Sequence, residues 1–211
     1  MIPDPRVYRI AFSTNVERVA LALAHKGVRA QWVDVDADDR SPVERISGQD
    51  LVPVLVAASG EVISDSMAIV DWLERQVPEP ALWPAAPARR AEVDVFIEWF
   101  NRVWKVPPNA IAAERDRLVP DTARLQGWNA ALAGWLFWFE ALLEGREFLM
   151  GDAFGAADVC AFPFLKYGVL APDPDDGDPF HAVLADHLPI TQAIFPRLAD
   201  WVERVDALPR A

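Results

Sequence analysis

The chain changes character once, at a cluster of prolines. Four prolines lie close together, at positions 78, 80, 84 and 87. Proline cannot continue a helix and stiffens the segment around it, so the cluster is the natural boundary between two folding units. The apolar period changes several times before the cluster and stays helical after it. We therefore expect one domain over residues 1–77, a proline-rich linker over 78–88 and an all-helical domain over 89–211.

The pattern before the prolines predicts strands and helices in the order βαβαββα. Short β-prone or alternating runs predict the strands, at residues 7–11, 31–35, 54–56 and 61–63. Apolar residues at helical spacing predict the helices, over 16–25, over 42–46 and from about residue 66 onward. The last two strands are expected to form an antiparallel hairpin, because only a short turn joins them. The first domain is therefore expected to be an α/β domain.

The second domain is expected to contain only helices. Apolar residues recur at helical spacing in four segments, residues 89–105, 123–143, 156–170 and 194–205. The segment from Pro172 to Pro179 is too rich in proline and aspartate to be a helix interior. Its carboxylates could hold Ca²⁺, but they lack the regular oxygen-ligand spacing of a calcium loop. We interpret this segment as a solvated loop.

Composition excludes several classes of partner. The chain has 211 residues, 52% of them hydrophobic, so it can bury a large core. Its formal net charge of -12 opposes binding to nucleic acid and to anionic membranes. A single cysteine, Cys160, excludes an intrachain disulfide, and the three histidines share no metal-ligand spacing with it. No apolar run approaches the roughly 20 residues of a membrane span and no leader precedes the first strand, so we expect a cytoplasmic protein without a metal.

A hydroxyl-rich segment, Ser13-Thr14-Asn15, lies between the first strand and the first helix. Such residues are preferred helix N-caps, so a capping role is one interpretation. A serine at this point can also donate its hydroxyl to an anion, while the helix dipole adds a favourable field. Both effects favour the thiolate form of a bound thiol. Ser13 would then activate a nucleophile and would not itself attack.

Two further segments offer groups that suit an amino-acid-like ligand. Asp65 and Ser66 open a helix directly after a strand, which places a carboxylate, a hydroxyl and unpaired helix amides at one point. Pro53 follows Val52 at the start of a strand and is often only an edge-strand residue. If the Val52-Pro53 bond is cis, the backbone of Val52 can pair with a peptide-like ligand as an added strand would. These residues predict a small-molecule site.

The sequence resembles the cytosolic glutathione S-transferases in five segments. Three of them are in the first domain: Ser13 to Val19, Leu51 to Leu55 and Ser64 to Ile69. The other two are in the second domain: Phe148 to Asp158 resembles the start of that family's core helix, and Phe195 to Val205 resembles its final helix. The resemblance implies a thioredoxin-like glutathione-binding domain followed by an all-helical domain. It points to a bacterial-looking, serine-type member, similar to the phi, theta and zeta classes.

In the thiol site, the resemblance implies roles for individual residues. Ser13 corresponds to the residue that faces the glutathione sulfur, with Asn15 orienting Ser13 or its loop. Val52, before a cis-Pro53, corresponds to the backbone that pairs with the cysteinyl group. The reaction implied is attack of the thiolate on an electrophile.

The two ends of glutathione are assigned in the same way. Asp65 and Ser66 correspond to the residues that hold the γ-glutamyl end, and Arg40 falls near the usual basic residue for the glycine carboxylate. Leu51 stands where many members have Lys or Gln, so one contact is expected to be missing. Gly155 replaces the usual hydroxyl cap of the core helix, and we expect Asp158 to bond back to the cap amide in a structural role.

The electrophile pocket is expected on the first helix of the second domain. This region carries an apolar stripe, Phe96, Trp99, Phe100 and Val103. Such a stripe is also typical of a core or dimer contact. A homodimer is implied by the family and would use residues 71–90 and the following helix.

Several functions stay open at this point. The first is a transferase that conjugates glutathione to a small apolar electrophile. The second is a non-catalytic binding or regulatory module, because the same fold is used in both ways. The third is a transferase or isomerase that uses another low-molecular-weight thiol. Thiol-disulfide exchange is disfavoured, because Ser13 stands where a reactive cysteine would be needed.

Overall fold

The structure is a computed structural model that describes residues 3–115 and 117–211. The chain divides into two compact units, residues 1–83 with 208–211 and residues 84–207, called here the first unit and the helical unit. The domain limits expected from the sequence stay predictions. Among the described residues, no helix is long and apolar enough to cross a membrane.

The described strands of the first unit form one mixed sheet in the order β2-β1-β3-β4. The strands are β1 (Arg6–Arg9), β2 (Gln31–Asp34), β3 (Val54–Val56) and β4 (Val62–Ser64). Strand β1 pairs parallel with β2 and antiparallel with β3, and β3 pairs antiparallel with β4. The predicted order βαβαββα is confirmed, with strand ends shifted by a residue or two.

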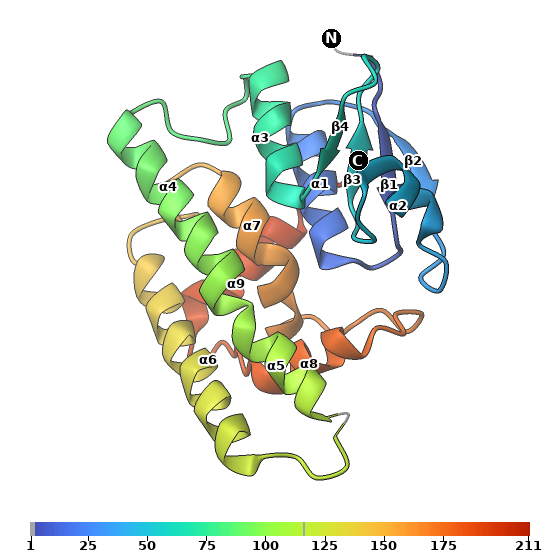
Figure 1. Cartoon of the computed structure of the whole chain (residues 1–211). Helices are drawn as coiled ribbons and strands as arrows, with labels where there is room; N and C mark the ends of the chain where they lie inside the picture. The colour runs from blue at the N-terminus through green and yellow to red at the C-terminus, as the bar shows by residue number, and fades with distance from the viewer. Residues whose placement is uncertain (1–2, 116) are drawn as a thin grey trace. The chain divides into compact units, whose positions relative to one another are not determined.

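Helices cover both faces of this sheet (Figure 1). They are α1 (Thr14–His25), α2 (Ser41–Ser47) and α3 (Ser66–Gln76). Helices α1 and α3 pack against each other on one face, and α2 lies on the opposite face. There Val43 of α2 packs in an apolar cluster with Tyr8, Val54 and Val56 of the strands. The alternation of side chains along each strand gives the sheet two apolar faces, so both must be covered.

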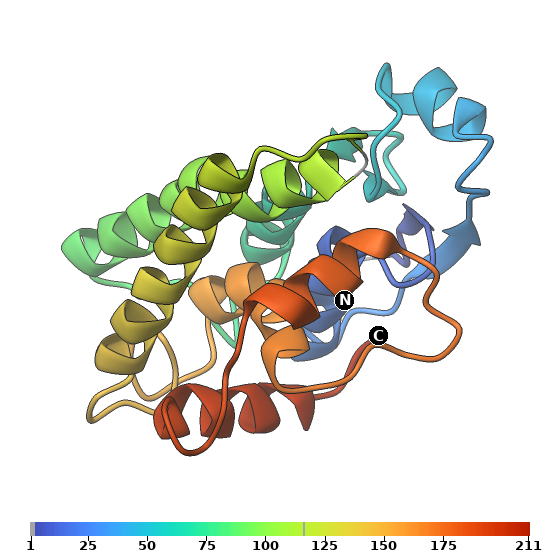
Figure 2. The same cartoon turned by 90° about the horizontal axis from the view of Figure 1, so that it is seen from below.

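The helical unit is arranged around α7. Its elements are α4 (Pro87–Trp99), a π-helical turn (Phe100–Trp104), α5 (Val106–Arg115), α6 (Thr122–Leu142), α7 (Ala156–Leu165), a 3-10 turn (Lys166–Gly168), α8 (Pro179–His187) and α9 (Pro196–Asp206). Helix α7, orange in Figure 2, contacts α4, α8 and α9. Its residues are buried throughout, which explains why α7 is apolar all round.

Two helices were absent from the sequence prediction. Helix α5 contains Pro107 and Pro108, and these fit because they lie in its first turn, where the N–H groups have no intrahelical partner. Helix α8 begins at Pro179, directly after the acidic loop, and Asp178 caps it by accepting from the N–H of Phe180 at 2.9 Å. The sequence analysis interpreted proline and aspartate in this segment as signs of a loop, but Asp178 and Pro179 begin a helix.

Asp158 holds the start of α7 in place, as expected for a structural residue. Its Oδ2 accepts from the N–H of Gly155 at 2.9 Å. Its Oδ1 accepts from the N–H of Leu149 at 2.9 Å and from the indole Nε1 of Trp201 at 2.8 Å. The side chain therefore joins the preceding loop, α7 and α9, which is more than the capping contact predicted from the sequence.

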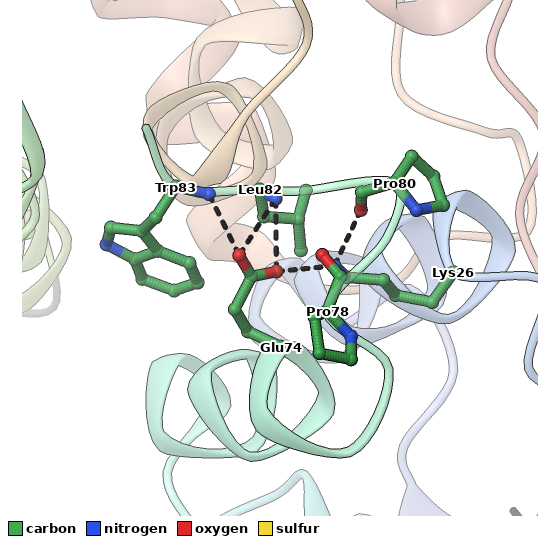
Figure 3. Close-up of polar contacts among 6 residues, drawn as sticks. All are labelled: Lys26, Glu74, Pro78, Pro80, Leu82 and Trp83. Atoms are coloured by element: carbon green, nitrogen blue, oxygen red, sulfur yellow. Dashed lines mark hydrogen bonds and ion pairs between the residues drawn. The ribbon is translucent and has the colours of Figure 1, made fainter. Parts of the chain in front are cut away.

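A buried ion pair fixes the proline-rich segment of the first unit (Figure 3). The Lys26 ammonium, 0% exposed, pairs with Oε2 of Glu74 and donates to the carbonyl of Pro80 at 2.6 Å. The Glu74 carboxylate also accepts from the N–H groups of Leu82 and Trp83, at 3.0 Å and 3.3 Å. The pair thus connects the end of α1, helix α3 and residues 78–83, which are far apart in sequence.

Candidate functional site

The sheet brings three predicted segments of the site to one edge. Helix α1 follows the carboxyl end of β1, and α3 follows the carboxyl end of β4. Strand β3 is antiparallel to both, so the residues before it, including Val52, lie at the same edge. The segments of Ser13, Val52 and Asp65 therefore meet at this edge of the sheet. The pairing of the strands brings them together, although they are far apart in sequence.

Ser13 is the N-cap residue of α1 but does not use its side chain as a cap. Among the hydrogen bonds of the described residues, none involves its hydroxyl, which is half-buried. The preceding residue, Phe12, has a φ of 61°, a left-handed conformation that is rare for a bulky side chain, and is 41% exposed. The hydroxyl at the start of α1 is thus available to an anion, and the capping interpretation is wrong for the side chain.

Val52 precedes a cis peptide bond to Pro53. Pro53 is buried and Val52 is half-buried against the sheet cluster. Within the described part of the chain, neither the N–H nor the C=O of Val52 takes part in a hydrogen bond. Leu51 is 59% exposed, and its side chain has no polar group to offer a ligand. Its carbonyl accepts from Nε2 of Gln49 at 3.0 Å.

Asp65 and Ser66 form the start of α3. One carboxylate oxygen of Asp65, Oδ1, caps the helix by accepting from the N–H of Met67 at 2.9 Å and of Ala68 at 3.0 Å. Its φ of 81° is uncommon for a residue other than glycine. Asp65 is exposed, and its Oδ2 has no partner among the described residues, so this oxygen can accept from a ligand ammonium. Ser66 is buried directly behind it.

Arg18 is a site residue that the sequence analysis missed. Its Nη1 donates to Oδ1 of Asn15 at 3.3 Å and to Oγ of Ser66 at 3.2 Å. It therefore joins the first turn of α1 to the start of α3. The sequence does contain a sign of this role. Arg18 lies between the apolar residues Val16 and Val19 of a predicted helix, and a charged residue on the buried face of a helix is uncommon.

Arg40 lies apart from these contacts. It is the N-cap residue of α2, and its Nε donates to the carbonyl of Ala37 at 3.1 Å. Beside it, hydrogen bonds from the side chain and backbone N–H of Ser41 hold the pKa of the Asp39 carboxyl below its usual value. Arg40 is half-buried, and its role at a glycine carboxylate stays a prediction.

The predicted electrophile residues do not share one environment in the helical unit. Phe96 and Trp99 line a groove of about 400 Å³ with Glu92, Val95, Trp135, Trp138 and Met150. The rings of Trp99 and Trp138 are 5.0 Å apart. Phe100 is fully buried and stacks on Trp104 at 4.4 Å, whereas Val103 is exposed on the π-helical turn. Of the four, Phe96 and Trp99 are therefore the ones that an apolar ligand in this groove would contact.

The remaining titratable groups of the described residues were compared with the pattern of a metal site. Within residues 3–115 and 117–211, no group of three or more His, Cys, Asp or Glu side chains could hold a metal ion. The acidic loop is only partly solvated, because the buried Asp176 carboxylate lies 2.6 Å from Nδ1 of His181. That pair anchors the loop to α8, and the cysteine at position 160 is fully buried.

Comparison with protein families gives two matches that cover different parts of the chain. Residues 7–81 match the model of the glutathione S-transferase N-terminal domain. Residues 129–209 match that of the glutathione S-transferase C-terminal domain. A thioredoxin-like unit followed by a helical unit is the glutathione S-transferase fold, so the predicted fold class is confirmed.

Curated relatives and solved structures agree with this class. Glutathione S-transferase omega-1 of Mus musculus is 27% identical over 76% of this chain and 65% of its own length. FtsZ-localized protein A of Caulobacter vibrioides is 33% identical over 71% of this chain and 70% of its own length. A glutathione S-transferase structure from Rhodospirillum rubrum superposes with a TM-score of 0.72 and 26% identity, over 96% of this chain and 88% of that one. This chain belongs to the glutathione S-transferase family.

Proposed function

We propose that this protein is a serine-type glutathione S-transferase that activates the glutathione thiolate for attack on a small apolar electrophile. The observation that carries the proposal is the Ser13 hydroxyl at the start of α1, which has no partner among the described residues. It lies at the same sheet edge as the unused backbone groups of Val52 and the start of α3. The Ser13 hydroxyl can recognise a thiol, the backbone of Val52 a peptide backbone, and the start of α3 the α-amino acid end of a ligand.

Each group has a defined task in this proposal. Ser13 donates to the sulfur, and together with the α1 dipole it favours the thiolate, which is the nucleophile. Val52 pairs with the peptide backbone of glutathione through its N–H and C=O. Oδ2 of Asp65 accepts from the γ-glutamyl ammonium, while Ser66 at the start of α3 binds its carboxylate. Arg40 is assigned to the glycine carboxylate and Phe96 with Trp99 to the electrophile.

A second candidate function is a non-catalytic binding or regulatory role. It is favoured by the 33% identity to a relative whose name, FtsZ-localized protein A, describes localisation and no reaction. A transferase or isomerase that uses another low-molecular-weight thiol is the third candidate. Glutathione binding with turnover supports the first candidate, and binding without turnover of any electrophile supports the second.

We further propose a cytoplasmic homodimer of bacterial type. Its contact surface would include residues 71–90 and the helix that follows, α4. Val95 of α4 is exposed and lines one groove with the exposed Trp138 of α6. Exposed apolar groups that gather in this way are typical of an interface between protein chains.

Ser13→Ala is expected to lower kcat/KM about 10- to 100-fold with a chromogenic aryl halide, because one hydrogen bond to a charged sulfur is lost. Glutathione affinity should change little, since Val52, Asp65 and Ser66 remain. Steady-state kinetics and calorimetry measure the two quantities. Ser59→Ala, in the exposed turn between β3 and β4, is the matched control and should leave both unchanged. Unchanged turnover in Ser13→Ala would remove Ser13 from the mechanism.

A further inference from the structure

The start of α1 carries two local energetic costs. Ser13 does not cap the helix with its side chain, although such a cap normally stabilises a helix start. Phe12, just before it, has a φ of 61°, and a bulky residue keeps such a conformation only where its surroundings hold it. Contacts from other parts of the chain must therefore hold the first turn of α1 in place.

The segment of residues 208–211 makes such contacts. It belongs to the first unit, although it follows α9 of the helical unit in sequence. Nη2 of Arg210 donates to Oε1 of Glu17 at 3.1 Å, across a sequence separation of 193 residues. The N–H of Ala211 donates to the carbonyl of Ala20 at 3.2 Å. The segment is therefore bonded to α1 through a side chain and through its backbone.

Both contacts fall near the start of α1, on one face of the helix. Glu17 and Ala20 are three residues apart, so they are neighbours on the helix surface. The N–H of Glu17 donates to the carbonyl of Ser13 at 3.0 Å, which closes the first turn. The side chains of Arg210 and Glu17 are only 25% and 14% exposed, so solvent and salt screen their ion pair less than an exposed one. The ion pair thus acts on the turn that Ser13 begins.

The guanidinium of Arg210 is itself held in place. Its Nη1 donates to the carbonyl of Leu208 in the same segment. A guanidinium is planar and presents its N–H groups in a fixed fork, so a bond on Nη1 also orients Nη2 toward Glu17. The contact with α1 is therefore directional, and a lysine at the same position would keep the charge without the fork.

We propose that Arg210 is a positioning residue of the thiol site, which holds the first turn of α1 through Glu17 and so keeps the Ser13 hydroxyl in place. The inference rests on the proposed function, in which Ser13 donates to the sulfur of the bound thiol. Helices fray from their ends, so a contact at Glu17 lowers the population in which the first turn is open. When that turn is open, Ser13 cannot donate to the sulfur, and the thiolate is less stabilised.

The first test needs no ligand. Hydrogen exchange followed by NMR reports how often the bond from the Glu17 N–H to the Ser13 carbonyl opens. Arg210→Met is expected to speed exchange of the Glu17 amide about tenfold, and Arg210→Lys by less than about threefold, because lysine keeps the ion pair. The amide of Ile69, bonded to the carbonyl of Asp65 at the start of α3, is the internal control and should not change. A wild-type exchange rate at Glu17 in Arg210→Met would overturn the inference.

The second test follows the thiol. In Arg210→Met, kcat/KM for glutathione is expected to fall about three- to tenfold and the apparent pKa of the bound thiol to rise, because Ser13 is displaced part of the time. The dissociation constant of glutathione, measured by calorimetry, should change less than about twofold, since the other groups assigned to the ligand are intact. Arg210→Lys should restore most of the activity. Arg29→Met removes an exposed arginine 4.0 Å from Asp4 and should leave all these quantities unchanged.

A further variant keeps the inference testable if Arg210→Met does not fold. Ala211→Pro removes the N–H that donates to Ala20, and it should also speed exchange at Glu17, although less than Arg210→Met does. Lower stability with an unchanged pH profile would mean that the segment is only structural, and would overturn the inference. A wild type that neither binds nor turns over glutathione would overturn the proposed function, and the exchange rate of Glu17 would then decide the hold on α1 by itself.

Discussion

Asp158→Ala is expected to lower the free energy of unfolding by about 4 kcal/mol, because it leaves buried donors without an acceptor. The donors are the N–H groups of Leu149 and Gly155 and the indole of Trp201, at 2.8 to 2.9 Å from the carboxylate. An unsatisfied buried donor costs about 1 to 3 kcal/mol, so three of them account for the effect. Denaturant unfolding, followed by tryptophan fluorescence, measures the change.

The control for this prediction is Asp152→Ala, in the same loop. Asp152 is exposed, and removal of its side chain should change the free energy of unfolding by less than about 0.5 kcal/mol. A loss below about 1 kcal/mol in Asp158→Ala would contradict the hydrogen-bond account. Near-wild-type near-UV circular dichroism in the folded variants would show that the comparison concerns stability and not a changed fold.

Asp158→Asn adds a pH test to the same measurement. Burial raises the pKa of the Asp158 carboxyl from 3.8 to about 6, although its hydrogen bonds act in the opposite direction. The folded protein then holds this proton more tightly than the unfolded chain, so the contribution of Asp158 to stability falls as the pH rises from about 4 to about 6. The change amounts to about 3 kcal/mol and is absent in Asp158→Asn. A difference between the two proteins that does not vary with pH would refute the raised pKa.

Glu74→Ala is expected to lower the free energy of unfolding by about 3 to 5 kcal/mol, because it leaves the Lys26 ammonium buried without its counter-ion. The N–H groups of Leu82 and Trp83 lose their acceptor as well. The Lys26→Met/Glu74→Met double variant removes both charges together, so it should be more stable than Glu74→Ala, although the N–H groups of Leu82 and Trp83 still lack their acceptor. Urea unfolding of the single and double variants gives the coupling between the two residues directly.

An exposed ion pair serves as the comparison for this buried one. Glu98 of α4 pairs with Arg102 of the π-helical turn, and both side chains are more than half exposed. Glu98→Ala should therefore cost less than about 1 kcal/mol. Equal losses in Glu74→Ala and Glu98→Ala would mean that burial of the Lys26–Glu74 pair has no energetic consequence.

The parts of the fold that depend on local patterns could be predicted from the sequence. Alternation gave the strands, helical spacing gave α1, α3 and α6, and the Asp65-Ser66 pair marked the start of a helix. Helices α5 and α8 were missed, because their prolines and aspartate are equally typical of loops and of helix starts. A local signal of that kind does not separate the two cases.

The parts of the site that depend on long-range contacts could not be predicted. Lys26 and Glu74, and Arg18 and Ser66, are each 48 residues apart, and their pairing follows from the packing of α1 on α3. The sequence could not show which residues of the apolar stripe Phe96, Trp99, Phe100 and Val103 are accessible to a ligand, for a related reason. Helical spacing placed Phe96 and Phe100 together, but only the packing of α6 and α7 decides that Phe100 enters the core.

The most direct test of the account is a calorimetric titration of glutathione into wild type and Asp65→Asn. Asparagine caps a helix as well as aspartate does, so this change removes the charge and keeps the start of α3. Asp121→Asn makes the same change at the N-cap of α6, where Asp121 accepts from the N–H of Arg124, and should leave binding unaffected. We expect saturable binding to wild type and binding at least about tenfold weaker in Asp65→Asn. Absence of binding to wild type, or equal affinity in Asp65→Asn, would contradict the glutathione site proposed here.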